Sequence, residues 1–477
     1  MKKRLLVIAI ILVIIIPCLK ALNYSPIINS GLKKTLPELQ KEFLNLRFGM
    51  LICFGSSNFS DHDWANPNIS PKLINPKSLN CKQWADAAAS AGMTYGCLTT
   101  KHHSGFCIWD TKTTDYNIMN SPFKRDIVKE FAEAFRKKGL KVSLYYSILD
   151  IHHNIRPGWV NQHKNKFIKK QLTELLTKYG EINTLLIDGW DSPWSRISYD
   201  EISFSEIYKL VKSLQPNCLV IDHNAAKYPS DYLFYSDIKQ YEQNAGQLIS
   251  RKHNNLPAQA GIPINLNWFW KKSSPNEIVK KAEFLVNDNL IPLNQVHCNF
   301  LLSVTPNRDG LLDNNVIVEL NKIGKIWDHS KLPSNSIVVQ KPFTTTNFAK
   351  KQRTNSSWAE DIAISDMATD DDFKTCWIPS IYEKKSYLEV IFDKPKSFNT
   401  IGIVESDYGK PFEAKTKLKA YKLQYWDGEK WGNINIKEDF NRIRFHHFPL
   451  LKASKVRIQI QSCEPQFGIA ELLVCKE

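Results

Sequence analysis

The chain has 477 residues, 43% of them hydrophobic and 23% charged, and 63 Lys and Arg against 48 Asp and Glu give a formal net charge of +15. This length is more than one compact core normally holds, so we expect two or three domains, and the composition excludes a disordered chain. The basic residues form no cluster with interleaved aromatic side chains, so we expect no nucleic-acid partner. The excess positive charge is either spread over solvated helix faces or favours an acidic glycan.

The first residues are typical of a signal peptide. Three cations precede an apolar run from Leu5 to Ile16, and small residues follow near Ala21. A run of 12 residues is too short to span a bilayer comfortably, so we predict a signal peptide over residues 1–21 and no membrane span. The mature protein is then expected in the periplasm or outside the cell. Lipid anchoring at Cys18 is an alternative, although Ile-Pro-Cys is a poor lipobox.

Short β-rich runs alternate with amphipathic helical patterns from residue 48 to about residue 330. The strand-like runs are Met50–Phe54, Tyr95–Thr99, Val142–Tyr146, Thr184–Ile187, Cys218–Ile221, Tyr232–Tyr235, Ile262–Leu266 and Phe300–Val304. The helical patterns include Lys82–Ala91, Asp126–Lys138, Phe167–Tyr179, Ser205–Leu214, Pro275–Val286 and Val316–Trp327. About eight such units predict an α/β fold, a closed (β/α)8 TIM-like barrel over residues 22–332. A doubly wound open sheet is the rival, but the turn after the first strand lacks the glycine-rich pattern of a nucleotide site.

After residue 332 the helical periodicity stops and short alternating runs follow. These runs are Leu388–Phe392, Thr400–Val404, Tyr421–Trp426, Val456–Ile460 and Ala470–Val474. They predict an antiparallel β-sandwich over residues 347–477, joined to the barrel by a linker over residues 333–346.

Asp188 directly follows the apolar run Thr184–Ile187 and precedes Gly189. In a parallel barrel the C-terminal ends of the strands form one rim, and active sites lie there. A carboxylate at that rim suits a pocket better than core packing, although a turn or helix-capping aspartate is the alternative. Glycoside cleavage uses two such carboxyl groups, one as nucleophile and one as acid/base. We therefore interpret Asp188 as a candidate nucleophile.

His102 and His103 follow the second predicted strand. Two consecutive side chains point in different directions, so one histidine can bind a substrate while the other orients it. Metal binding is the rival interpretation. It would require further ligands at a defined spacing, and the ten cysteines form no CxxC pair, so we predict no metal in the barrel.

Glu242 is the candidate for the second carboxyl group. It follows the sixth predicted strand and lies beside Tyr241. A partly apolar setting would raise its pKa towards the range that an acid catalyst needs. Asp222 and Asp237 compete for this role, and an ordinary surface glutamate is the remaining alternative.

Several spaced segments between about residues 37 and 330 resemble the α-L-fucosidases of glycoside hydrolase family 29. They are Arg47–Ile52, Thr100–Trp109, Leu176–Gly180, Leu186–Gly189 and Asn299–Gly310. The resemblance implies an exo-acting enzyme that hydrolyses terminal α-L-fucosides of oligosaccharides or polysaccharides, with retention of configuration and without a cofactor. It also implies that the fucose pocket is lined by His102, His103, Tyr145 and Trp268. We expect Cys53 and Trp109, beside or within these segments, to contact the sugar as well.

The chain departs from the family pattern at several positions. Cys53-Phe54-Gly55 stands where the family usually has His-Trp-Gly, and Ser104 replaces the usual Asp. Other alignments place Asn244 or Gln259 at the position of the acid/base. A weakened hydrolase, a sugar-binding protein without turnover, and a hydrolase for a related sugar such as α-L-galactose therefore stay as alternatives.

The C-terminal region resembles the discoidin or coagulation-factor type C sandwich, a jelly roll of the galactose-binding type. The matching segments are Ala368–Trp377 and Ile469–Val474. The resemblance implies that this domain binds carbohydrate and holds a structural calcium ion, to which Asp370 and Asp372 could contribute. A purely structural sandwich is the alternative. The sequence does not specify an oligomeric state.

Overall fold

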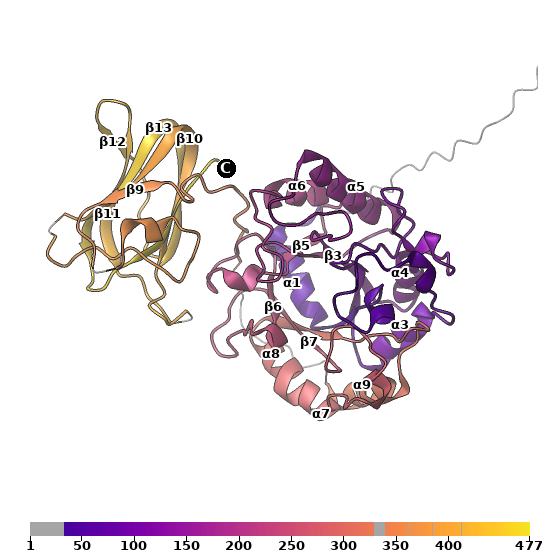
Figure 1. Ribbon diagram of the computed structural model, residues 1–477. Coiled ribbons are helices and arrows are strands. Elements are labelled where there is room, and N and C mark those ends of the chain that lie inside the picture. Colours follow the sequence, from indigo (N-terminus) through magenta and orange to yellow (C-terminus); the bar gives the residue numbers. More distant parts are fainter. Residues whose placement is uncertain (1–32, 329–338, 361, 384, 412) are drawn as a thin grey trace, which may run out of the picture.

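The computed structural model describes residues 33–328 and 339–477, apart from positions 361, 384 and 412, as two lobes (Figure 1). The predicted signal peptide, Cys18 and part of the predicted linker lie outside the described residues. Within the described ranges, no helix has both the length and the apolar character that crossing a membrane requires.

The first lobe is a barrel of eight parallel strands, as the alternating pattern predicts. Its strands are β1 (Phe48–Ile52), β2 (Tyr95–Lys101), β3 (Lys141–Ser147), β4 (Thr184–Asp188), β5 (Leu219–Asp222), β6 (Lys239–Glu242), β7 (Ala258–Pro263) and β8 (Cys298–Ser303). The hydrogen-bonded order is β5-β4-β3-β2-β1-β8-β7-β6. The barrel is therefore nearly closed, with β5 and β6 at the two sides of its seam.

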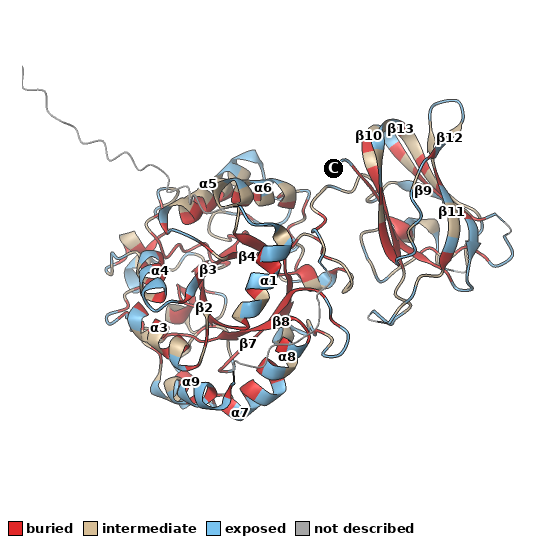
Figure 2. Ribbon diagram, turned by 180° about the vertical axis from the view of Figure 1, so that it is seen from behind, coloured by how far each residue is buried: buried red, intermediate tan, exposed pale blue. Residues whose placement is uncertain are grey.

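Helices surround the strands and bury one face each (Figure 2). The longer ones are α3 (Cys81–Ser90), α4 (Ile127–Lys137), α5 (Gln162–Lys178), α6 (Phe204–Leu214) and α9 (Asn314–Ile326). In α4 the apolar side chains Ile127, Phe131 and Phe135 recur at helical spacing and are fully buried. Asp126 caps this helix by accepting a hydrogen bond from the backbone N–H of Lys129. The sequence pattern thus fixes both the start of α4 and its buried face.

Helix α1 (Leu36–Leu46) covers the N-terminal end of the barrel, and no periodicity argument predicted it. It begins with a capping box between Thr35 and Glu38. Its buried Phe43 packs 6.0 Å from the ring of Tyr95, at the start of β2. Helix α1 therefore covers this end of the barrel, opposite the rim where the strands end.

The predicted sixth strand, Tyr232–Tyr235, is wrong, because β6 is Lys239–Glu242. The aromatic residues that suggested a strand instead pack against the second lobe: the ring of Tyr232 lies 5.1 Å from that of Phe445. The seventh strand also begins earlier than predicted. It consists mainly of small residues, Ala258-Gln259-Ala260-Gly261, whose weak β propensity hid a strand that β6 and β8 hold by backbone pairing.

The predicted helix Pro275–Val286 is partly wrong. Residues 277–281 are not helical, and the backbone N–H of Lys280 donates to Ile264 O. A short 3-10 helix (Ser274–Asn276) precedes them, and α-helical structure begins only at α7 (Ala282–Leu285) and continues through a π-helical turn (Val286–Leu290) into α8 (Ile291–Gln295). Tertiary pairing with the end of β7 therefore outweighs the local periodicity.

The second lobe is the predicted antiparallel sandwich. Its strands are β9 (Arg353–Ser356), β10 (Tyr387–Glu405), β11 (Leu418–Trp426), β12 (Trp431–Ile434), β13 (Ile443–Cys463) and β14 (Ile469–Cys475). The two predicted runs Leu388–Phe392 and Thr400–Val404 both belong to β10, whose pairing with β13 shifts register between Ile391 and Lys396. Besides β13, the first part of this long strand pairs with β9 and its last part pairs with β14.

Candidate active site

A cavity of about 250 Å³ opens at the C-terminal ends of the barrel strands. Its lining combines carboxylates, imidazoles and indole rings, which are the groups that bind and cleave sugars. The lining residues are Leu51, Cys53, Asp63, Trp64, Thr99, His102, His103, Tyr145, Asp188, Trp194, His223, Glu242, Ala245, Trp268 and Phe269. The structure thus brings seven of the eight sequence-predicted site residues to one cavity, and only Trp109 is absent from its wall.

Asp188 ends β4, and its carboxylate is held by two donors. The phenol of Tyr145, on β3, donates to Oδ2 at 2.5 Å, and the indole N–H of Trp194 donates to Oδ1 at 3.3 Å. Gly189 follows with φ of 107°, and a Cβ there would lie 2.9 Å from the backbone N of Leu149. Strand β4 can therefore turn at the rim only because a glycine follows the aspartate.

Glu242 ends β6 on the other side of the cavity. Burial raises the pKa of its carboxyl group above the ordinary value, and the nearby Asp188 raises it further. His223 and a hydrogen bond with Trp268 partly offset this rise in pKa. The environment therefore keeps Glu242 protonated to higher pH than an exposed glutamate, as a general acid requires.

His223 lies between the two carboxyl groups and was not identified from the sequence. Its Nδ1 is 3.7 Å from Asp188 Oδ2 and 3.8 Å from Glu242 Oε2. Because the two distances share one nitrogen, their sum of 7.5 Å is an upper bound on the separation of the two oxygens. That bound admits the spacing of about 5–5.5 Å that retaining glycosidases show. Its position directly after β5 was the only feature of the sequence that could have indicated His223 as a site residue.

The hydrogen bonds of His103 define which of its nitrogens faces the cavity. Its Nδ1 lies 2.7 Å from Ser147 Oγ, and that hydroxyl donates its own proton to Leu149 O at 2.8 Å. The Ser147 oxygen must then accept, so Nδ1 of His103 carries the proton and Nε2 is an acceptor. Burial lowers the pKa of His103 to about 3 and that of His102 as well. Both imidazoles are therefore neutral and suited to hydroxyl groups.

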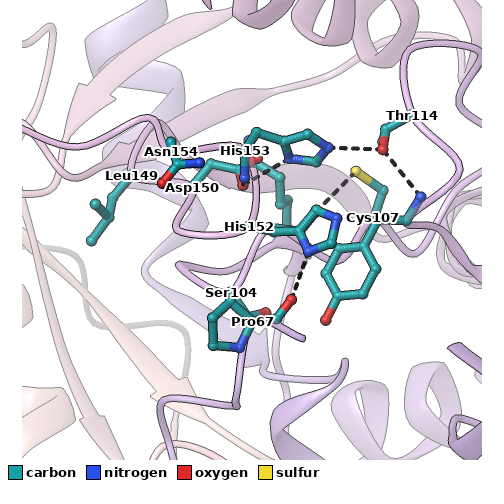
Figure 3. Close-up of polar contacts among 12 residues, drawn as sticks. Pro67, Ser104, Cys107, Thr114, Leu149, Asp150, His152, His153 and Asn154 are labelled. Carbon is teal, nitrogen blue, oxygen red and sulfur yellow. Dashed lines mark hydrogen bonds and ion pairs between the residues drawn. The ribbon is translucent and has the colours of Figure 1, made fainter. Parts of the chain in front are cut away.

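A polar network around Asp150 and His153, which Figure 3 shows, supports the loop that holds His102 and His103. Asp150 accepts from Lys101 at 2.9 Å and lies 2.8 Å from Nδ1 of His153, whose Nε2 contacts Thr114 at 2.8 Å. The backbone N–H of Ile151 donates to His103 O at 2.9 Å. The network thus fixes the backbone of the histidine pair from below, which limits how far the two rings can move.

Cys53 lies in the cavity wall, with its sulfur 3.5 Å from Ser303 Oγ and 3.8 Å from Thr99 Oγ1. Burial raises the pKa of its thiol to about 12, so the group is a neutral, weak hydrogen-bond partner. Trp109, by contrast, is fully buried and donates its indole N–H to Glu174. The structure therefore places Cys53 where a sugar can touch it and places Trp109 in the packing beneath.

The competing acids do not line the cavity. Asp222 accepts a short hydrogen bond from Tyr199, and Asp237 pairs with Lys212 at 2.8 Å. Gln259 donates to the phenol of Tyr95, and Asn244 is exposed after β6. Burial raises the pKa of Asp222 to about 7, so the pKa of this residue would by itself also suit a general acid. Position decides against Asp222, because an acid must reach the scissile oxygen.

Three aromatic side chains of the cavity wall were missed in the sequence: Trp194, which donates to Asp188, and two that pack on the histidine pair. Trp64, in the loop after β1, lies 4.6 Å from the ring of His103, and Phe269, after β7, lies 4.9 Å from the ring of His102. Trp64 is 43% exposed, an unusual amount for an indole, so one face is open to a ligand. The sequence could have indicated Trp64 as a site residue, because Asp63-Trp64 places an acid beside an indole just after a strand.

Comparison with known proteins identifies both lobes. A model of the α-L-fucosidase family matches residues 38–330, and a model of the F5/8 type C domain matches residues 349–473. The chain is 27% identical to α-L-fucosidase 1 of Arabidopsis thaliana over 390 residues, which cover 75% of this chain and 71% of the plant protein.

Solved structures support the same fold. α-L-Fucosidase isoenzyme 1 from Paenibacillus thiaminolyticus is similar with a TM-score of 0.55 and 22% identity, over 90% of this chain and 100% of that one. A glycoside hydrolase 29 family member from an unknown rumen bacterium has a TM-score of 0.52 and 23% identity, over 92% of this chain and 76% of that one.

Proposed function

The chain belongs to the α-L-fucosidase family of glycoside hydrolases, and from this premise we propose that it removes terminal α-L-fucose from oligosaccharides or polysaccharides with retention of configuration. The observation that supports this proposal most is that Asp188 and Glu242 line one cavity and each lie within 3.8 Å of the same nitrogen, Nδ1 of His223. One carboxylate is held by two donors, whereas burial favours the protonated form of the other. Double displacement needs this difference between its two carboxyl groups.

In the first step, Asp188 attacks the anomeric carbon while Glu242 donates its proton to the glycosidic oxygen. The bond between that carbon and oxygen breaks, and an ester between fucose and Asp188 forms. In the second step, the Glu242 carboxylate takes a proton from water, the water oxygen attacks the same carbon, and the ester breaks. The hydrogen bonds from Tyr145 and Trp194 stabilise the departing Asp188 carboxylate.

The cavity wall offers a distinct partner to each side of the sugar. Neutral His102 and His103 can accept from hydroxyl groups, and within the described residues Nδ1 of His102 has no hydrogen-bond partner. The indole of Trp268 provides an apolar surface. Cys53 offers only a weak hydrogen-bond partner, which distinguishes this wall from one that has an imidazole at the same position. We therefore expect the protein to discriminate least between sugars that differ at the hydroxyl nearest Cys53.

A panel of aryl glycosides tests this assignment directly. We expect turnover of the α-L-fucoside, slower turnover of the α-L-galactoside, and none of the β-L-fucoside. Proton NMR during the first minutes should show α-L-fucose appearing before its mutarotation to the β anomer. Initial formation of β-L-fucose would contradict the double displacement, and a preference for the α-L-galactoside would reassign the sugar.

We also propose that the sandwich binds a structural calcium ion beside Glu471. Among the described residues, no group of three or more His, Cys, Asp or Glu side chains is arranged to hold a metal ion, so such a site would depend on carbonyl oxygens as well. Glu471 is nevertheless buried, its Oε2 has no hydrogen-bond partner among the described residues, and burial together with Asp371 and Asp370 raises its pKa well above the ordinary value. A cation there would satisfy this oxygen, with Asp370, Asp372 and Thr375 available from the adjacent loop.

Removal of calcium is expected to destabilise the protein. A cation that binds only the folded state raises the free energy of unfolding, so EDTA should lower the Tm by about 2–5 °C and added calcium should restore it. Differential scanning fluorimetry checks this, with Glu471→Gln as the variant that should no longer respond. A Tm that is the same with EDTA and with calcium would refute the site.

A further inference from the structure

The barrel has a seam between β5 and β6, and the seam lies at the catalytic rim. These two strands are the ends of the hydrogen-bonded order, so no ladder joins them in the described structure. They are linked lower down, where the backbone N–H of Asp237 donates to Val220 O at 2.8 Å and the Asp237 carboxylate accepts from the Val220 N–H at 2.9 Å. Since Asp237 precedes β6 and lies beside β5, most of β6 extends beyond the end of β5. Glu242 therefore has a strand, β7, on one side only.

On its other side, strand β6 is supported by the chain that connects it to β5. We call residues 223–238 the β5–β6 segment. Its first residue, His223, contacts Glu242 at 3.8 Å. At its other end Lys239, buried in β6, donates from Nζ to the carbonyl oxygens of Tyr228, Pro229 and Tyr232. The position of β6 is thus coupled to the position of this segment.

The outer side of the β5–β6 segment packs on the sandwich. Two nitrogens of the Arg442 guanidinium group, Nε and Nη2, donate to the Asp231 carboxylate. The third, Nη1, donates to Glu405 O within the sandwich. Rings from both lobes pack around this pair, with Phe445 5.1 Å from Tyr232 and Phe373 5.4 Å from Phe234. Arg442 is 6% exposed, so the forked pair is shielded on its sandwich side.

We infer that docking of the β-sandwich positions the acid/base of the barrel. Arg442 holds Asp231, and through the β5–β6 segment it holds His223 and strand β6 at the place from which Glu242 reaches the glycosidic oxygen. Contacts with the sandwich thereby hold β6 in place where no hydrogen-bonded ladder joins it to β5 in the described structure. Arg442 is a positioning residue, because it belongs to the sandwich and does not line the cavity. The inference rests on the proposed role of Glu242.

The test uses the dependence of the rate on the leaving group. A misplaced acid slows only substrates whose leaving group needs protonation, whereas a general loss of structure slows all substrates equally. For Arg442→Gln we expect kcat/KM to fall about tenfold on phenyl α-L-fucoside and less than about twofold on the 2,4-dinitrophenyl α-L-fucoside, since partial loss of acid catalysis removes part of a 10²–10⁴-fold effect. Asp231→Asn should show the same pattern from the barrel side. The double variant should be no worse than either single one.

Arg457→Gln is the matched control, because Arg457 pairs with Glu389 at 3.6 Å inside the sandwich and should leave both rates unchanged. Equal losses on both substrates, or no loss in a folded Arg442 variant, would overturn the inference. Glu242→Gln separates it from the proposed function. If that variant shows no leaving-group dependence, the role of Glu242 fails; if it does and the Arg442 and Asp231 variants do not, only the positioning by the sandwich fails.

Discussion

Replacement of Asp188 by Ala is expected to lower kcat on an aryl α-L-fucoside by on the order of 10⁵-fold, which corresponds to about 7 kcal/mol of activation free energy. The reason is that, in the proposed double displacement, no ester intermediate can form without this carboxylate. Binding should persist, because His102, His103 and Trp268 still line the cavity. Steady-state kinetics and a binding measurement with L-fucose together check the expectation.

Azide distinguishes loss of the nucleophile from loss of structure. In Asp188→Ala a small anion can occupy the vacated space and attack the anomeric carbon from the same side as Asp188 would. The product is then β-L-fucosyl azide, of inverted configuration, and turnover rises with azide concentration. Asp110→Ala is the control, because Asp110 pairs with Lys112 near the surface and its removal should change neither rate nor product. Wild-type activity in the Asp188 variant would end the assignment.

Replacement of Glu242 by Gln is expected to lower kcat/KM by about 10²–10⁴-fold on phenyl α-L-fucoside and far less on a substrate with an activated leaving group. The amide keeps the shape of the side chain but cannot give up a proton to the glycosidic oxygen. Asp222→Asn is the matched comparison, since burial raises the pKa of Asp222 to about 7 but the residue lies outside the cavity wall. A leaving-group dependence in the Asp222 variant instead of the Glu242 variant would reverse the assignment.

The pH profile provides a second measurement on Glu242. In the proposed mechanism the acid form of Glu242 is the active one, and burial raises the pKa of the group, so kcat/KM should fall as pH rises through this raised pKa. The basic limb should vanish in Glu242→Gln. A carboxyl group whose pKa is raised by folding stabilises the folded state at low pH, and that contribution is lost as pH rises through the folded-state pKa. Glu242→Gln should therefore raise the Tm at neutral pH, and an unchanged or lower Tm would contradict the burial argument.

Several features follow from the sequence because they depend on local patterns. The alternation of strands and helices predicts the barrel, since each helix must bury its apolar face on a parallel sheet. Asp188 lies at the rim because it ends an apolar strand and a glycine follows it. His102 and His103 reach the same rim for the same reason, as parallel strands end on one side.

Other features depend on distances between residues far apart in the chain, and only the tertiary structure decided them. Local sequence could not place Glu242 rather than Asp222 in the cavity, because both end strands of the nearly closed barrel and only the tertiary structure shows which of them lines the cavity. The aromatic run at Tyr232–Tyr235 has the pattern of a strand, yet its rings pack on a second domain more than a hundred residues later in the chain. Trp109 matches a motif and is nevertheless buried, because a motif records which residue is present and packing decides where its side chain points.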